Sequence, residues 1–115
     1  MSLVSILIAA YNEKFVIGRT LDTIKSLDYP ARKIQVIIAD DSTDDTTNVI
    51  DKKVGELNSS GIVTLVSRRN NREGFKSGAL NHAAPLLRGE YVLLLDADST
   101  VTPGSLSRGL AAFRL

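Results

Sequence analysis

The sequence of 115 residues contains no cysteine, which excludes disulfide frameworks and thiolate metal sites. It also has no excess charge of either sign, because 14 basic residues against 13 acidic ones give a net charge of +1. A chain so nearly neutral has no strong field that would draw it to nucleic acid or to an anionic membrane surface. No nucleic acid is therefore expected among its partners.

Long hydrophobic runs are absent as well. No stretch reaches the ~20 apolar residues of a membrane-spanning helix, and the apolar N-terminus lacks the basic flank of a signal peptide. The glycine-rich Gly-x-Gly-x-x-Gly pattern of nicotinamide-binding folds is missing after the first apolar run, as is a P-loop. The length suits one domain with one core, so residues 1–115 are expected to form a single unit.

What the sequence does contain is four short apolar runs, at residues 4–9, 34–39, 62–66 and 91–95. Each is continuous rather than alternating, as in parallel strands covered on both faces. Between and after them, apolar residues recur at helical spacing: Ile17, Leu21 and Ile24; Ile50, Val54 and Leu57; Ala79, Ala83, Leu86 and Leu87; Leu106, Leu110 and Phe113. This βαβαβαβα order predicts an α/β fold with a parallel sheet and right-handed crossovers.

Two features bear on where the predicted helices end. Pro85 predicts a kink or an early end in the third helix. Thr102 and Pro103 predict the start of a fourth helix, in which the chain ends at Leu115 without a stop signal. We therefore expect a truncated domain, with apolar surface exposed around the fourth helix.

The segments that follow the apolar runs are the places to look for chemistry, since ligands of open parallel sheets bind at the carboxyl ends of the strands. Asp96 and Asp98 follow the fourth run with one residue between them. Two carboxylates so placed can turn toward one Mg²⁺ or Mn²⁺ ion, with diphosphate oxygens and water as further ligands. A turn or capping pair is the simpler alternative, but the position directly after a buried run favours the metal.

Asp40 and Asp41 follow the second run. Ser42, Thr43 or Asp44 can cap the helix after them, and capping does not require the aspartate pair. A carboxylate at this position can accept a hydrogen bond from a base N–H or a ribose hydroxyl.

Tyr11, Asn12 and Glu13 follow the first run. Tyr11 can pack against a base and Glu13 can reach a polar edge, whereas Asn12 is predicted to cap the first helix. A partly buried core position is an equally good interpretation of Tyr11.

Four cations lie within nine residues before the third helix, namely Arg68, Arg69, Arg72 and Lys76. Together with a glycine and a helix start they suit the binding of a diphosphate. A solvated basic face is the alternative, and His82, inside the helix, is expected to be structural.

These stretches together resemble the family 2 glycosyltransferases of the GT-A fold, in particular the cellulose- and glucomannan-synthase-like branch. The resemblance rests on Tyr11-Asn12-Glu13, on Asp40-Asp41-Ser42-Thr43-Asp44, on the segment from Gly74 to Asn81 that reads Gly-Phe-Lys-Ser-Gly-Ala-Leu-Asn, and on Asp96-Ala97-Asp98. Each motif alone is weak, but the four occur in the family's order and spacing over essentially the whole chain.

The resemblance implies a Rossmann-like parallel sheet of order 3-2-1-4 with helices on both faces. It implies that Tyr11, Glu13 and Asp41 hold the base and ribose of a nucleotide-sugar donor, UDP- or GDP-linked. Lys76 would lie near the nucleotide or its phosphates. Asp96 would approach the donor sugar or ribose, and Asp98, with Asp96, would coordinate the Mg²⁺ or Mn²⁺ cofactor.

The family's catalytic carboxylate, which lies well downstream and deprotonates the acceptor hydroxyl, has no counterpart in this sequence. We therefore expect this chain to bind a donor without completing transfer to a glycan or lipid-linked acceptor. The resemblance also implies a membrane-embedded parent protein in polysaccharide biosynthesis, with this region on the cytoplasmic side.

Two other functions remain open from the sequence. One is a non-catalytic nucleotide-binding module. The other is a phosphatase of the haloacid dehalogenase type, in which Asp96 is the nucleophile of an Asp-x-Asp-x-Thr motif, although that family carries the motif on its first strand.

Overall fold

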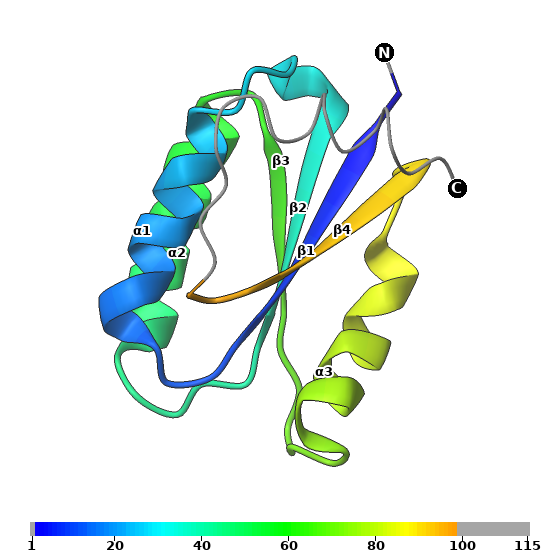
Figure 1. The fold of residues 1–115 in the computed structure, drawn as a ribbon. Helices are drawn as coiled ribbons and strands as arrows, with labels where there is room; N and C mark the ends of the chain where they lie inside the picture. Colours follow the sequence, from blue (N-terminus) through cyan, green and yellow to red (C-terminus); the bar gives the residue numbers. More distant parts are fainter. Residues whose placement is uncertain (1, 99–115) are drawn as a thin grey trace.

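The chain forms one four-stranded sheet with helices packed on both faces (Figure 1), in a computed structural model that describes residues 2–98. The elements in chain order are β1 (Val4–Ala10), α1 (Lys14–Lys25), η1 (Ala31–Lys33), β2 (Ile34–Asp40), α2 (Thr46–Ser59), β3 (Val63–Ser67), α3 (Phe75–Ala83), η2 (Ala84–Leu86) and β4 (Tyr91–Asp96), where η marks a short 3-10 turn. All neighbouring strands are parallel, and their order is β3-β2-β1-β4. The predicted fold and strand order are confirmed.

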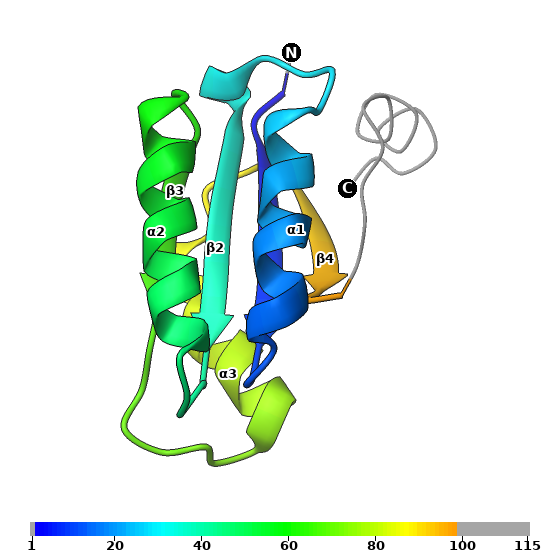
Figure 2. The same cartoon turned by 90° about the vertical axis from the view of Figure 1, so that its left-hand side faces the viewer.

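The two faces of the sheet carry different helices. Figures 1 and 2 show α1 and α2 side by side on one face and α3 on the opposite face. The larger core lies beneath α1 and α2, where Ile6, Ile8 and Ile38 of the sheet meet Leu21 and Ile50 of the helices with no exposed surface. Fully burying such a side chain contributes roughly 1.5–3 kcal/mol, so this layer holds the sheet in shape.

The edge strands differ from the prediction that each strand is covered on both faces. β1 and β2, in the centre, are buried along nearly their whole length. On β4, by contrast, Leu94 is 61% exposed, and on β3, Val63 is 56% exposed. The physical reason is that α3 has nine residues and packs mainly over β1 and β2.

The ends of the third helix follow from its sequence. α3 stops at Ala83, and the chain continues as the 3-10 turn that contains Pro85, as the proline predicts. The fourth helix predicted after Thr102, with the exposed surface expected around Leu106, Leu110 and Phe113, lies outside the described residues. Within residues 2–98, no helix combines the length and the apolar character that crossing a membrane requires.

The register of the sheet brings three strand ends to the same level. Ala10 at the end of β1 lies opposite Asp40 of β2, and Ala9 lies opposite Asp96 of β4. The loops that leave these strands therefore emerge side by side at one edge of the sheet.

Candidate functional site

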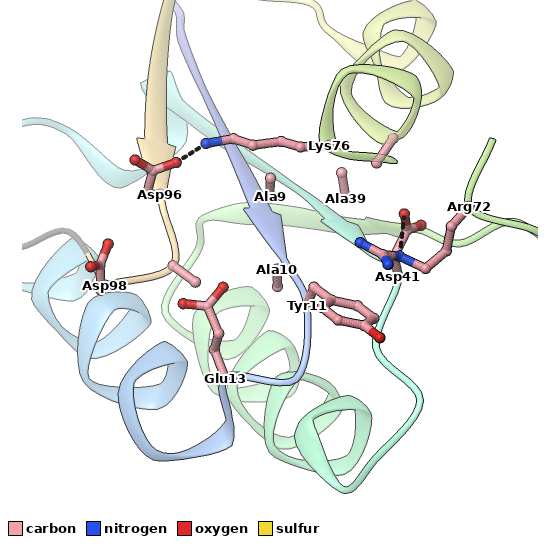
Figure 3. A pocket seen from close by; sticks show the side chains of 12 residues that line it. Ala9, Ala10, Tyr11, Glu13, Ala39, Asp41, Arg72, Lys76, Asp96 and Asp98 are labelled. Carbon is pink, nitrogen blue, oxygen red and sulfur yellow. Dashed lines mark hydrogen bonds and ion pairs between the residues drawn. The ribbon is translucent and has the colours of Figure 1, made fainter. Parts of the chain in front are cut away.

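A cavity of about 310 Å³ opens at this edge, between the ends of β1, β2 and β4 and the start of α3 (Figure 3). It is lined by all six residues that the sequence predicts for the donor and the metal: Tyr11, Glu13, Asp41, Lys76, Asp96 and Asp98. They come from four separate segments of the chain, so the fold places them around one space.

Small side chains leave that space free. The alanines that line the cavity are Ala9, Ala10, Ala39, Ala79 and Ala97. Ala39 at the end of β2 and Ala79 on α3 are both nearly fully buried, so a larger side chain at either position would fill the cavity.

Carboxylates gather at the β4 side of the cavity. Asp96 ends the strand and Asp98 follows in the turn, and both are exposed. Asp96 forms an ion pair with Lys76 of α3 (Figure 3). Carboxylate oxygens are the donors that Mg²⁺ and Mn²⁺ prefer, so the chemistry of this side of the cavity fits such an ion.

The carboxylates do not form a complete cation site by themselves. Among residues 2–98, no group of three Asp, Glu or His side chains lies close enough to hold a metal. A cation bound by Asp96 and Asp98 would therefore need further oxygen ligands from water or from a diphosphate, as Mg²⁺ commonly does.

The two consecutive aspartates at the end of β2 have different surroundings. The Asp40 side chain has no exposed surface and lies 3.0 Å from Nε of Arg68. It also accepts hydrogen bonds from the Ser42 N–H (2.9 Å) and the Thr47 hydroxyl (3.1 Å). Asp40 is thus a paired, buried charge that does not line the cavity.

Asp41 turns toward the cavity and is held there by arginines. Both oxygens of its carboxylate accept from one guanidinium, with 3.1 Å to Nε and 2.7 Å to Nη2 of Arg69. A second guanidinium, that of Arg72, lies 3.7 Å from the carboxylate. Hydrogen bonding to Asp41 raises the pKa of Arg69, so this guanidinium stays charged.

Neither of these aspartates caps α2. Asp44 accepts a hydrogen bond of 2.9 Å from the N–H of Thr46, the first residue of the helix. Hydrogen bonding to Thr46 lowers the pKa of Asp44. The cap position of α2 is Asp45, without a side-chain hydrogen bond, so the prediction of a cap at Ser42, Thr43 or Asp44 is wrong. Asp44 instead accepts from the first helical N–H from the position before the cap.

Tyr11 is 40% exposed, so the interpretation as a core aromatic is wrong. The central carbon of the Arg72 guanidinium lies 3.6 Å from the centre of the Tyr11 ring. The flat face of this ring thus borders the cavity and already stacks against a planar, cationic group.

The prediction that Asn12 caps α1 is also wrong. The cap position is Glu13, without a side-chain hydrogen bond. Asn12 instead adopts a φ of +52°, and its side-chain oxygen accepts from the Thr43 N–H at 2.8 Å. Its own N–H donates to the Ser42 hydroxyl at 3.0 Å. Asn12 therefore ties the loop after β1 to the loop after β2.

The four cations before and at the start of α3 fall into two pairs. Arg68 and Arg69 pair with Asp40 and Asp41, so they are not free for a diphosphate. Arg72 and Lys76 line the cavity. His82 is exposed on α3 and borders a different, open hollow beside it.

The sequence matches the protein family described as Glycosyl transferase family 2 over residues 5–114. The chain belongs to this family. A beta-monoglucosyldiacylglycerol synthase from Nostoc sp. strain PCC 7120 is 36% identical over 112 residues, which are 96% of this chain and 23% of that protein. A probable glucomannan 4-beta-mannosyltransferase 1 from Arabidopsis thaliana is 34% identical over 112 residues, 94% of this chain and 20% of that protein.

The fold agrees with that assignment. The mannosyltransferase PcManGT from Pyrobaculum calidifontis, solved in complex with GDP-mannose and Mn²⁺, superposes with a TM-score of 0.78 at 31% identity. The match covers 86% of this chain and 28% of that one. The family 2 chain described here thus spans about a quarter of the length of these relatives.

Family membership disfavours the phosphatase alternative. In this family 2 glycosyltransferase chain, Asp96-Ala97-Asp98 stands at the end of the fourth strand, after three βα units. The phosphatase signature also needs Thr100, which lies outside the described residues.

Sequence reasoning missed Arg72 as a separate contributor to the cavity. Its Nε is buried without a hydrogen-bond partner, since the nearest carboxylate oxygen is 3.7 Å away. The one available signal was its place among four closely spaced cations, which could not distinguish it from Arg68 and Arg69.

Proposed function

We propose that the parent protein is a metal-dependent glycosyltransferase that transfers a sugar from a nucleoside diphosphate, UDP or GDP, to a glycan or lipid-linked acceptor. Residues 1–115 would be its nucleotide-sugar-binding half. One observation carries the proposal: an aromatic face, a base-facing carboxylate, two cations and a pair of exposed carboxylates surround the same cavity.

In this proposal the base lies against Tyr11. Stacking of a base on an aromatic ring contributes ~1–3 kcal/mol, and the ring is exposed for it. Asp41 accepts a hydrogen bond from a ring N–H of uracil or guanine, because each of its oxygens has a lone pair left beside the bond from Arg69. Glu13, at the mouth of the cavity, receives a ribose hydroxyl or the polar edge of the base.

The diphosphate lies between α3 and the end of β4. Asp98 and Asp96 would hold Mg²⁺ or Mn²⁺, which, when bound, acts as a Lewis acid on the leaving diphosphate. Lys76 contributes positive charge from the opposite side and, through its ion pair, holds Asp96 in place. The Arg72 guanidinium, which also lines the cavity, contributes a second positive charge near the nucleotide.

The relatives support the class of donor and acceptor. The Pyrobaculum enzyme was solved with GDP-mannose and Mn²⁺, and the name of the Nostoc enzyme specifies a diacylglycerol lipid. An acceptor of this kind fits a membrane-embedded parent with the donor site on the cytoplasmic side, which is our proposal for its location.

Donor binding is the part of the reaction that these residues can perform. A general base beside the acceptor hydroxyl is also required, and no carboxylate can be assigned to that role. Residues 99–115 contain neither Asp nor Glu nor His. The chain by itself would therefore act as a binding module within a longer enzyme.

Replacing Asp98 by Asn tests the proposed function. The change removes a charged oxygen ligand from a hard cation, so the Mn²⁺-dependent affinity for UDP or GDP should fall by about tenfold or more, which is about 1.4 kcal/mol or more. Isothermal titration with each nucleotide, with Mn²⁺ and with a chelator, measures this.

The matched control is Asp45→Asn, which makes the same change at an exposed carboxylate that forms no capping bond and does not line the cavity. Nucleotide affinity should be unchanged in that variant. An Asp98→Asn chain that binds nucleotide as tightly as the wild type, with the same dependence on Mn²⁺, contradicts the metal assignment.

A further inference from the structure

The Arg69 guanidinium connects three separate parts of the site. Beyond its two bonds to Asp41 at the end of β2, it donates to the main-chain oxygens of Glu73 (2.6 Å) and Phe75 (2.7 Å). Its side chain is only 11% exposed. One planar group thus joins a strand end to the turn that starts α3.

That turn has an uncommon backbone conformation, which explains why hydrogen bonds from Arg69 are needed to stabilise it. Gly74 has a φ of +73°, and Phe75, which is not a glycine, has a φ of +50°. A side chain in this left-handed region costs about 1–2 kcal/mol. The contorted turn is what directs the Glu73 and Phe75 carbonyls toward the Arg69 donors.

Gly78, one turn into α3, makes room for the same guanidinium. A Cβ atom at this position would lie 2.5 Å from Nη1 of Arg69 and 1.9 Å from the Glu73 oxygen. The helix can approach Arg69 because it carries no side chain there. The arginine, the turn and this glycine therefore form one arrangement.

We propose that Arg69 is a positioning residue for nucleotide recognition. It fixes the Asp41 carboxylate so that a lone pair faces the ring N–H of the base. It also fixes the start of α3, and with it Lys76, which lines the same cavity and pairs with Asp96. The inference rests on the proposed function. It adds that the several N–H donors of the planar guanidinium, and not its positive charge alone, determine the selectivity for the hydrogen-bonding edge of the base.

Arg68 provides a matched comparison within the same chain. It is the adjacent residue, and it also pairs with two carboxylates, those of Asp40 (3.0 Å) and Asp51 (2.8 Å). Neither of these carboxylates lines the nucleotide cavity, and none of the hydrogen bonds found for Arg68 reaches α3. Replacing either arginine by lysine keeps the positive charge and removes the planar guanidinium with its several donors.

The test compares Arg69→Lys, Arg68→Lys and the wild type in two measurements. The first is the ratio of affinities for two ligands, with Mn²⁺ present. One is UDP or GDP, whichever binds the wild type better, and the other is its analogue methylated on the ring N–H, which cannot donate to Asp41. Both ligands bind the same folded population, so partial unfolding does not change the ratio.

The second measurement is amide hydrogen exchange at the start of α3. The Gly78 N–H donates to Gly74 at 3.1 Å and the Phe75 N–H donates to Arg72 at 2.8 Å. These amides report whether the turn is held, and they do so without any nucleotide.

We expect the wild type and Arg68→Lys to prefer the unmethylated nucleotide by about tenfold or more, the effect of a hydrogen bond to a charged group. In Arg69→Lys the preference should fall several-fold, and the two amides should exchange faster. If Arg69→Lys keeps both the wild-type preference and the wild-type exchange, the inference is overturned while the proposed function stands. If the wild type binds neither UDP nor GDP, the proposed function is overturned, and with it the role of Arg69 in recognition, whatever the exchange shows.

Discussion

Adjacent residues in this site can have different roles because their side chains contact different partners. Asp40 and Asp41 are adjacent in sequence, yet one is a buried partner of Arg68 and the other faces the cavity. Asp40 is the last residue of β2 and Asp41 the first residue after it, and the two carboxylates pair with different arginines. A buried charge must be paired, whereas one at a cavity can also bind a ligand.

Replacing Asp41 by Ala tests this division. We expect nucleotide affinity to fall by about tenfold or more, since a hydrogen bond to a charged acceptor is lost. Affinity for Mn²⁺ alone should change little, because Asp41 is not a proposed ligand. Titrations with nucleotide and with metal, made well below the melting temperature, distinguish the two effects.

Asp40→Ala is the comparison for that experiment. It removes the acceptor of the Ser42 N–H and the Thr47 hydroxyl, so it should lower the melting temperature. Nucleotide affinity, measured well below that temperature, should change less than in Asp41→Ala. Equal weakening of nucleotide and of metal by Asp41→Ala would place Asp41 in the metal shell or in the fold.

The elements that carry the site begin in contrasting ways. α2 starts with a local hydrogen bond, in which Asp44 accepts from the N–H of Thr46 two residues later. α3 starts with two residues of positive φ and packs closely against a neighbouring turn through Gly78. The start of α2 thus depends on local sequence, and that of α3 on contacts from elsewhere in the chain.

A pair of glycine substitutions separates these two situations. Gly78→Ala should destabilise the chain by about 1–3 kcal/mol, because the new methyl group overlaps the Glu73 carbonyl. Gly55→Ala, in α2, meets nothing within 4 Å and should stabilise by about 0.5–1 kcal/mol through helix propensity. Urea unfolding of the two variants measures both effects. Changes of the same sign would contradict this account of the α3 start.

The hydrogen bond between Asp44 and the N–H of Thr46 predicts that stability depends on pH. The folded-state pKa of Asp44 is lowered from 3.8 by its hydrogen bonds to Thr46, so the charged carboxylate stabilises the folded chain. Its contribution to stability is present above pH 3.8 and is lost as the pH falls through the lower folded-state value.

Asp44→Asn should therefore melt below the wild type near pH 7, and the difference should shrink toward about pH 2. Asp45→Asn, which removes a neighbouring carboxylate without a capping bond, should show a smaller difference at both values. Thermal melts across this range provide the measurement, and a difference that grows on acidification would rule out the hydrogen bond between Asp44 and Thr46 as its cause.

At the scale of the whole molecule, the candidate functional residues lie at one edge of the parallel sheet. The three strand ends that meet there supply residues of the cavity that we propose as the base and metal sites. The chain spans 23% of the Nostoc relative, and the acceptor side of the reaction has no candidate residue within residues 2–98. Donor binding and sugar transfer should therefore be separable.

We predict that the purified chain binds a nucleotide sugar but shows no multiple-turnover transfer to an added acceptor. Sugar transfer requires a donor site, a metal site and a general base. The cavity can supply the first two, and no residue of the chain can be assigned the third. An assay with labelled donor, run beside a nucleotide titration, gives the result. Transfer that is abolished by Asp98→Asn would show that the chain contains a base of its own.

Much of this molecule could be predicted from local sequence. The continuous apolar runs mark β1 to β4 within a residue or two, because buried parallel strands need apolar side chains on both faces. The strand order came from the family resemblance, which the four motifs carry together. All six predicted donor and metal residues line one cavity, since residues after parallel strands emerge at the same edge.

What only the tertiary structure decided is which charges pair with one another. Arg69 meets Asp41 across 28 positions of sequence, and Asn12 meets Thr43 across 31. Periodicity and motif spacing describe neighbours along the chain, and they carry no information on contacts between loops that strand pairing brings together. The sequence by itself therefore determined the sheet and the chemical character of its edge. Folding determined that Arg68 and Arg69 pair with the aspartates at the end of β2, while Arg72 and Lys76 line the cavity, because the position of each charge depends on the partners that packing places beside it.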